Sequence, residues 1–230
     1  ITQKGKQKKN IGLIFNTLPG STHPIHAISV QELKKQLEVD WIFHKNKKVD
    51  IAIIPFYQSD VRIKIPIKVR ITSFNDDLFA NEDNYSELYD VFFLGYQPET
   101  YSTNGIKRIT PIFRSGIISS INHDGSLYID AYSFTGNSGS PVFIRTSAYD
   151  GNTGIMSIGK KHFRFLGIVS AYIPYEEKLL DLKTYEMKIG HRENMGLTLV
   201  WSVESIEEIM EYKGFKKQEE KIRRRHIKSN

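Results

Sequence analysis

The sequence predicts an all-β body followed by one C-terminal helix. Eight short segments rich in Ile, Val, Phe and Tyr are separated by Gly, Asn, Asp and Pro, a pattern typical of an antiparallel barrel or sandwich. The segments are residues 11–17, 49–56, 62–71, 90–96, 114–121, 126–132, 140–145 and 163–173. Near the end of the chain, apolar residues recur at helical spacing after Ser202, at Val203, Ile206, Ile209 and Met210.

Residues 62–71 show the clearest strand periodicity. Ile63, Ile65 and Ile67 alternate with polar residues and with Pro66. A proline inside such a run favours a sheet edge or a bulge. We therefore expect a half-buried strand with one face toward the core.

A short helix is expected in the N-terminal part of the chain. Ser29 precedes residues 30–37, and Glu32 follows Ser29 by three positions. This capping-box spacing lets the two side chains accept hydrogen bonds from each other's backbone N–H groups at the start of a helix.

The C-terminal helix should be followed by an irregular tail. Gly214 stands where a helix C-cap is expected. Beyond Phe215 the apolar pattern ends, because the remaining residues are almost all polar or charged. We expect residues 216–230 to form a frayed or extended tail.

The net charge of +6 comes from the two ends of the chain. Residues 216–230 carry seven Lys and Arg against two Glu, and residues 1–10 carry four Lys, so the body between them is negative. A basic body would indicate a nucleic-acid surface, whereas basic ends alone are typical of solvated termini. Solvated termini are expected, with an anionic partner of the C-terminal tail, nucleic acid or lipid, as the alternative.

The chain contains no cysteine, which excludes disulfides, thiolate zinc sites and a cysteine nucleophile. Secreted domains usually carry disulfides, so their absence favours a reducing interior. A cytoplasmic location is expected, although an extracellular bacterial protein can also lack cysteine. No apolar run approaches about 18 residues, so no membrane-spanning helix is expected.

The strongest candidate for chemistry is the stretch FTGNSGSPVF, residues 134–143. It connects two predicted strands and places Ser138 between Asn137 and Gly139. A tight turn of this kind can expose the hydroxyl and direct backbone N–H groups at one point before it, as acyl transfer requires. Taken alone, the stretch is more typical of a hairpin loop without chemistry. It does not match the G-x-S-x-G elbow, because residue 140 is Ser and a strand follows.

Three segments together resemble trypsin-like serine proteases. GNSGSPVF at residues 136–143 resembles the family's GDSGGPV signature around the nucleophile. LGIVSAY at residues 166–172 resembles its GIVSWG strand, and VDIAIIPF at residues 49–56 resembles the segment around its triad aspartate. Residues 194–201 and the helix after them resemble the family's last strand and terminal helix. The resemblance covers about residues 10–212 and is greater to the cysteine-free bacterial branch than to digestive enzymes.

This resemblance implies two packed antiparallel six-stranded β-barrels with a C-terminal α-helix, the first barrel being incomplete at its start. We expect residues 1–88 to form the first barrel and residues 89–201 the second, which carries the nucleophile. Residues 202–215 would form the helix and residues 216–230 a basic tail.

The resemblance also implies the catalytic roles. Ser138 would be the nucleophile, and the backbone N–H groups of Gly136 and Ser138 would form the oxyanion hole. Asp50 would orient a histidine and stabilise its imidazolium form. The enzyme would need no cofactor and no metal.

The substrate site follows from the same resemblance. Tyr132, six residues before the nucleophile, takes the position of the floor of the primary specificity pocket. Because Tyr132 is not an acid, a preference for Lys or Arg is not expected. Thr135 would line the same site, and Ser170, Ala171 and Tyr172 would contact the substrate chain.

The histidine departs from the family pattern. His44 is too close to Asp50 and resembles a non-catalytic family histidine, while His23 and His26 lie only 27 and 24 residues before Asp50. We expect the catalytic histidine upstream of Ile1. The alternatives are an inactive relative and a base role for His26 or His23 through an altered loop. The His-Pro-Ile-His pair has no third ligand at suitable spacing, so no metal site is expected.

Asn137 is the second departure. Zymogen-activated members of the family have Asp at this position, which pairs with a freshly cut N-terminal amine. Asn cannot ionise, so Ile1 should not be interpreted as a processed terminus. We expect the turn around Ser138 to form without proteolytic activation.

The sequence therefore predicts a trypsin-like serine endopeptidase that forms an acyl-enzyme with a protein or peptide substrate. One alternative is a catalytically inactive protease-fold module that binds an extended peptide along the Ser170–Tyr172 edge by strand addition. A second alternative is a non-proteolytic esterase that uses the same Ser138.

Overall fold

The computed structural model describes residues 2–3, 6–7, 12–16, 25–29, 31, 34–35, 38–55, 76–96, 111–145, 149–150, 155–156, 163–181 and 184–229. The chain divides into two units. Unit 1 comprises residues 1–74, 99–110 and 205–230, and unit 2 comprises residues 75–98 and 111–204. Each unit is described by itself.

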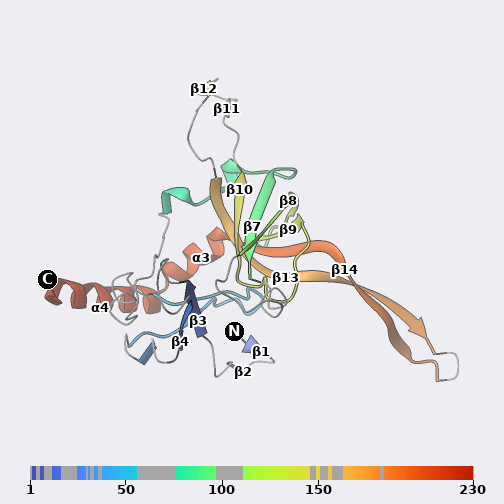
Figure 1. The fold of residues 1–230 in the computed structure, drawn as a ribbon, viewed down its shortest axis with the longest axis horizontal. Coiled ribbons are helices and arrows are strands. Elements are labelled where there is room, and N and C mark those ends of the chain that lie inside the picture. The colour runs from blue at the N-terminus through green and yellow to red at the C-terminus, as the bar shows by residue number, and fades with distance from the viewer. Residues whose placement is uncertain are drawn as a thin grey trace. The chain divides into compact units, whose positions relative to one another are not determined.

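Unit 2 contains a closed six-stranded antiparallel barrel (Figure 1). Its strands are β7 (Asp90–Gly95), β8 (Ile112–Ile121), β9 (Ser126–Asp130), β10 (Pro141–Arg145), β13 (Phe163–Leu180) and β14 (Met187–Ser202). Around the barrel the order is β10–β13–β14–β9–β8–β7, and pairing of β10 with β7 closes it. The prediction of an antiparallel barrel is confirmed for this unit.

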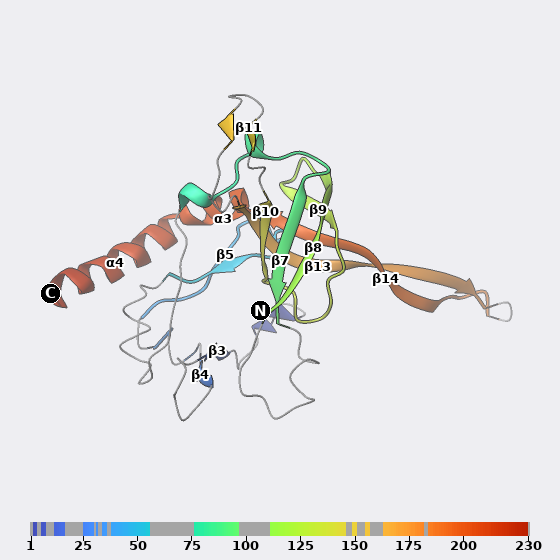
Figure 2. The same cartoon turned by 45° about the horizontal axis from the view of Figure 1, so that its top comes forward.

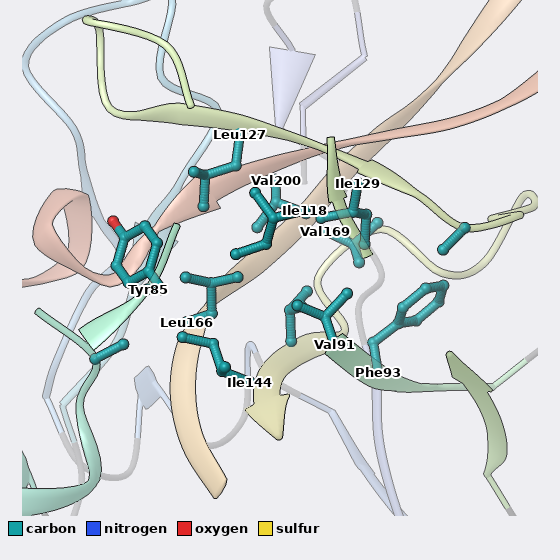
Figure 3. Packing of buried hydrophobic residues seen from close by; sticks show 13 residues of the cluster. Tyr85, Val91, Phe93, Ile118, Leu127, Ile129, Ile144, Leu166, Val169 and Val200 are labelled. Atoms are coloured by element: carbon teal, nitrogen blue, oxygen red, sulfur yellow. The ribbon is translucent and has the colours of Figure 1, made fainter. Parts of the chain in front are cut away.

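The barrel interior is filled by side chains that alternate along the strands. In β7, Val91 is 2% exposed and Phe93 is fully buried, whereas Asp90 faces solvent. Figure 3 shows these residues packing toward the side chains of the other strands. The cluster comprises Ala80, Tyr85, Val91, Phe93, Ile118, Leu127, Ile129, Ala131, Val142, Ile144, Leu166, Val169 and Val200. Each large apolar side chain buried here stabilises the barrel by about 1.5–3 kcal/mol.

Strands β13 and β14 continue beyond the barrel as a two-stranded ribbon (Figures 1 and 2). From Pro174 to Leu180, β13 pairs with β14 alone among the described strands. The sequence-predicted strand ended at residue 173, so this continuation was not predicted. Charged residues on both faces of the ribbon hide the alternation on which strand prediction depends. The turn at its end places Tyr185 in the left-handed region, with φ 56°.

The remaining elements of unit 2 are short. They are the 3-10 helices η1 (Asp76–Leu78) and η2 (Glu82–Asn84) and the strand pair β11 (Tyr149–Asp150) and β12 (Ile155–Met156).

Unit 1 contains three short antiparallel strand pairs in its described part. They are β1 (Thr2–Gln3) with β2 (Lys6–Gln7), β3 (Gly12–Asn16) with β4 (Ile25–Ser29), and β5 (Ile42–Phe43) with β6 (Ala52–Ile53). The predicted strand at residues 62–71 lies outside the described residues, as does most of the predicted helix at residues 30–37. A first barrel in this part of the chain stays a prediction.

Two helices close the chain, α3 (Val203–Met210) and α4 (Lys213–Ser229). The helix predicted after Ser202 is confirmed, but Gly214 lies in the first turn of α4 and is not the C-cap of α3. The expected extended tail is also wrong, because residues 216–229 are helical. Neither helix is long and apolar enough to span a membrane, and the same holds for every helix in the described ranges.

Helix α4 is stabilised by contacts within unit 1. Phe215, Gln218 and Ile222 lie on one face of the helix, and Ile222 is 1% exposed. The side chain of Gln218 accepts a hydrogen bond from the backbone N–H of Asp40 at 2.8 Å. Sequence patterning missed this helix because Ile222 is isolated within a basic run.

Replacement of Ile222 by Ala should unfold or detach α4. Removal of a buried Ile side chain typically costs about 2–5 kcal/mol. We expect the amides of residues 216–224 to be protected in native hydrogen exchange and to lose that protection in Ile222→Ala. Arg223→Ala, which changes the neighbouring exposed residue, should leave it unchanged. Fast exchange of these amides in the unmodified chain would show that the tail is extended after all.

Candidate active site

The turn at residues 134–140 is held by four backbone hydrogen bonds. The N–H of Asn137 donates to the carbonyl of Phe134 at 2.9 Å, and the N–H of Ser140 donates to that of Asn137 at 2.9 Å. Reciprocal bonds fasten the turn to β13: Gly139 N–H donates to Val169 O at 2.7 Å, and Val169 N–H donates to Ser140 O at 2.9 Å. The turn therefore has a fixed position on the barrel.

Asn137 is the buried centre of this turn. Its side chain is 1% exposed, and its Oδ1 accepts a hydrogen bond from the backbone N–H of Phe134 at 2.8 Å. Its Nδ2 lies against β7 so closely that a Cβ added at Gly95 would come within 1.8 Å of it. A neutral amide thus occupies the interior of the turn, and the turn forms without an ion pair at this position.

Ser138 lies at the exposed surface of the turn. Its Oγ donates a hydrogen bond to the backbone carbonyl of Ser170 at 2.8 Å. A hydroxyl has one proton to donate. In this arrangement that proton is directed at β13, and the side chain must rotate to transfer the proton to a base.

The hydrogen bonds of the turn leave particular N–H groups free. The N–H groups of Phe134, Asn137, Gly139 and Ser140 each donate to an acceptor within unit 2. Those of Gly136 and Ser138, with that of Thr135, have no hydrogen-bond acceptor among the described residues. Gly136 has φ 97°, in a region that favours glycine. The two groups expected to form an oxyanion hole are therefore available to a ligand.

One edge of β13 beside Ser138 has no partner strand among the described residues. The pairing with β10 ends at Ile168, after which Val169 bonds to the turn. Ala171 and Tyr172 pair with β14 alone in this part of the chain, and Ser170 lies at a register shift between the paired residues. Ala171 is exposed and Tyr172 half-buried. An extended peptide could add to this edge as a further strand.

Aromatic side chains lie next to the turn. Tyr132 is 56% exposed, and its ring atoms come within 3.4 Å of a Cβ built at Gly196, where φ is 82°. Its ring is stacked near that of Phe134, at 6.4 Å between centroids and 22° between planes. The guanidinium of Arg114 lies 4.7 Å from the Phe134 ring centroid. The side chain of Tyr132 therefore presents an aromatic surface without a carboxylate.

Asp50 belongs to unit 1, in the loop that leads into β6, and its side chain is exposed. His44, near it in sequence, is already engaged. Its Nδ1 accepts from the N–H of Asn46 at 3.1 Å, and its Nε2 lies 2.8 Å from Oε2 of Glu208. These bonds connect His44 to α3, and a non-catalytic role for His44 stays a prediction.

The other candidate histidines are placed only in part. His26 lies in β4, opposite Phe15 of β3, and His23 lies outside the described residues. Within the described ranges, no three His, Asp or Glu side chains are grouped so as to hold a metal ion.

A separate pocket of about 390 Å³ lies in unit 2. Its lining includes Tyr85, Asn122, His123, Ser202 and Glu204, and none of the predicted site residues. Burial raises the pKa of Tyr85, and the carboxylates of Glu204 and Glu82 raise it further. Tyr85 is therefore neutral at physiological pH.

Gly95→Ala should disturb the turn that carries Ser138. The added methyl group would overlap the Asn137 amide, and overpacking of this kind costs about 1–3 kcal/mol. We expect faster hydrogen exchange at the Gly139 amide in this variant. Gly214→Ala, whose methyl group would meet no atom within 4 Å, is the matched control and should leave that amide protected. Equal protection in both variants would show that Asn137 does not fix the turn.

Two residues of the site were missed at the sequence level, Gly95 and Gly196. A glycine inside a strand can indicate close approach by another group, but the sequence does not say which group approaches.

Comparison of the chain with protein-family models found no match, and neither did comparison with curated proteins.

Proposed function

We propose that Ser138 is the nucleophile of a peptidase that works through an acyl-enzyme, with a trypsin-like arrangement of the site. The observation that carries this proposal is the pattern of free N–H groups in its turn. The N–H groups of Gly136 and Ser138, like that of Thr135, have no acceptor among the described residues, while those of Asn137, Gly139 and Ser140 are bonded. Central residues of ordinary β-turns also leave N–H groups free, so the support for acyl transfer comes from these donors together with the exposed hydroxyl of Ser138 in the same turn.

In the proposed reaction, Ser138 Oγ attacks the carbonyl carbon of the substrate and its proton passes to an imidazole base. The carbonyl oxygen becomes an oxyanion, which the N–H groups of Gly136 and Ser138 stabilise. Loss of one such donor typically costs 10²- to 10³-fold in rate. The protonated base then gives its proton to the leaving amine, and water releases the acyl group from Ser138 by the reverse sequence of steps.

The substrate would lie in extended form along the edge of β13 at Ser170–Tyr172. The backbone groups of an unpaired edge can bond to a peptide of any sequence, and side-chain pockets then select among peptides. Tyr132 and Thr135 would contact the side chain next to the scissile bond. Because Tyr132 carries no charge, an apolar or aromatic side chain suits this position better than Lys or Arg.

The proposal requires a histidine that Asp50 orients. His44 is bonded to Glu208 and cannot serve without breaking that contact. His26 and His23 are the candidates that the printed sequence offers.

A peptide-binding module without catalysis is the second candidate. The observation that favours it is the bond from Ser138 Oγ to Ser170 O, which directs the hydroxyl proton away from any base. The same β13 edge would then hold a peptide without cleaving it.

A fluorophosphonate probe should label Ser138 wherever the histidine base is present: in this chain if the base is His26 or His23, and otherwise in a form extended before Ile1. The label should be lost in Ser138→Ala and retained in Ser119→Ala, which removes another exposed serine hydroxyl of the same unit. Loss of the label in His26→Ala or His23→Ala would identify the base. Absence of label in both the chain and the extended form, with binding of an extended peptide, would favour the binding module over the peptidase.

Tyr132→Asp should shift cleavage toward Lys and Arg at the position before the scissile bond. A carboxylate at this place would form a charge-assisted bond with the substrate cation, typically about 1.5–3 kcal/mol, or roughly 10- to 100-fold in kcat/KM. Tyr132→Asn has nearly the same shape as the Asp variant and no charge, and should show no such shift. Equal preferences in the two variants would remove Tyr132 from the specificity site.

A further inference from the structure

Helix α4 carries a line of exposed cations. Lys213, Lys217, Lys221 and Arg224 are spaced at i, i+4, i+8 and i+11, and all four are exposed. Residues at this spacing share one face of a helix. At about 1.5 Å of rise per residue, the line extends over roughly 16 Å.

More cations lie near the start of this line, in a loop from the N-terminal part of the chain. Lys45, Lys47 and Lys48 are exposed in the loop between β5 and β6. The backbone N–H of Lys45 donates to the hydroxyl of Tyr212 at 3.2 Å, and its Nζ lies 4.2 Å from the Tyr212 ring centroid. Tyr212 directly precedes Lys213, so the two groups of cations are adjacent within unit 1.

We call these residues the basic surface, namely Lys45, Lys47, Lys48, Lys213, Lys217, Lys221 and Arg224. Two of its cations are neutralised locally, because Lys221 pairs with Glu38 and Arg224 pairs with Glu220. The neighbouring carboxylates of Glu208 and Glu211 pair with His44 and Lys216.

Five cations of the basic surface form no ion pair with any described residue. They are Lys45, Lys47, Lys48, Lys213 and Lys217. The first turn of α4 also contains no acidic residue. Cations at a helix N-terminus oppose the helix dipole, so this arrangement destabilises the helix slightly. Residues that break a local rule without a folding benefit are expected at functional surfaces.

We propose that the basic surface binds the phosphate backbone of double-stranded nucleic acid. A row of cations on one face of a helix is attracted to the closely spaced phosphates of a duplex, which carries one negative charge per about 1.7 Å of its axis. Such contacts position the duplex and carry no sequence information, so binding should not depend on base sequence.

An anionic membrane is the other polyanion to consider. A helix that lies in a membrane needs an exposed apolar face beside its cations. The apolar residue Ile222 of α4 is buried within unit 1, and Phe215 is half-buried. The described exposed face of α4 is polar, which favours nucleic acid over lipid.

Fluorescence anisotropy of a labelled 20-base-pair DNA duplex, measured with the full chain between about 50 and 200 mM NaCl, tests this proposal. With four to six phosphates neutralised, log K should fall against log[salt] with a slope of roughly −4 to −5, for two unrelated duplex sequences alike. The triple variant Lys47→Gln, Lys213→Gln, Lys217→Gln should reduce the slope by about 2.7 and weaken binding at least tenfold.

The control variant removes three exposed cations elsewhere, Lys35→Gln, Arg145→Gln and Lys178→Gln, and has the same net charge. It should bind within about twofold of the unmodified chain. Equal weakening in both variants would reduce the effect to net charge and overturn the proposal. The proposal would also be overturned if the chain did not bind the DNA duplex. The same holds if the chain bound vesicles containing phosphatidylserine and not the duplex. The measurement of DNA binding does not depend on hydrolysis, so the proposal is tested separately from the role of Ser138.

Discussion

The side-chain amide of Asn137 is the constraint on which the candidate site depends. It bonds the backbone of its own turn at Phe134 and fills the space that Gly95 leaves open on β7. The turn would otherwise be held only by its four backbone hydrogen bonds, two within the turn and two to β13. Through this one buried group, the position of Ser138 is also linked to the packing of β7.

A neutral amide has a consequence for how the site forms. A buried carboxylate in this place would need a cation, because an unpaired buried charge is costly. The amide needs none, although its Nδ2 is buried without a hydrogen-bond acceptor in the described part of the chain. An unsatisfied buried donor costs about 1–3 kcal/mol. The turn can therefore form by folding alone, at a modest cost in stability.

The barrel could be predicted from sequence because its strands are short runs rich in Ile, Val, Phe and Tyr that are separated by turn residues, as residues 90–96 are. The position of Ser138 in an exposed turn between two strands also followed from local sequence. Helix α4 and the ribbon beyond Pro174 could not be predicted, since both are highly charged. Helix α4 also depends on contacts distant in sequence, such as that of Gln218 with Asp40. The close contact between the Asn137 side chain and Gly95 was missed because it also joins residues distant in sequence.

The central claim is that Ser138 forms a covalent bond with an acyl group. The most direct measurement is mass spectrometry of the full chain, quenched with acid during reaction with an activated ester and then digested. The account predicts an added acyl mass on the peptide that contains Ser138. The account would be contradicted if the ester or a peptide were hydrolysed while the acyl group appeared on another residue of the chain. Hydrolysis without an adduct at any time would contradict it as well.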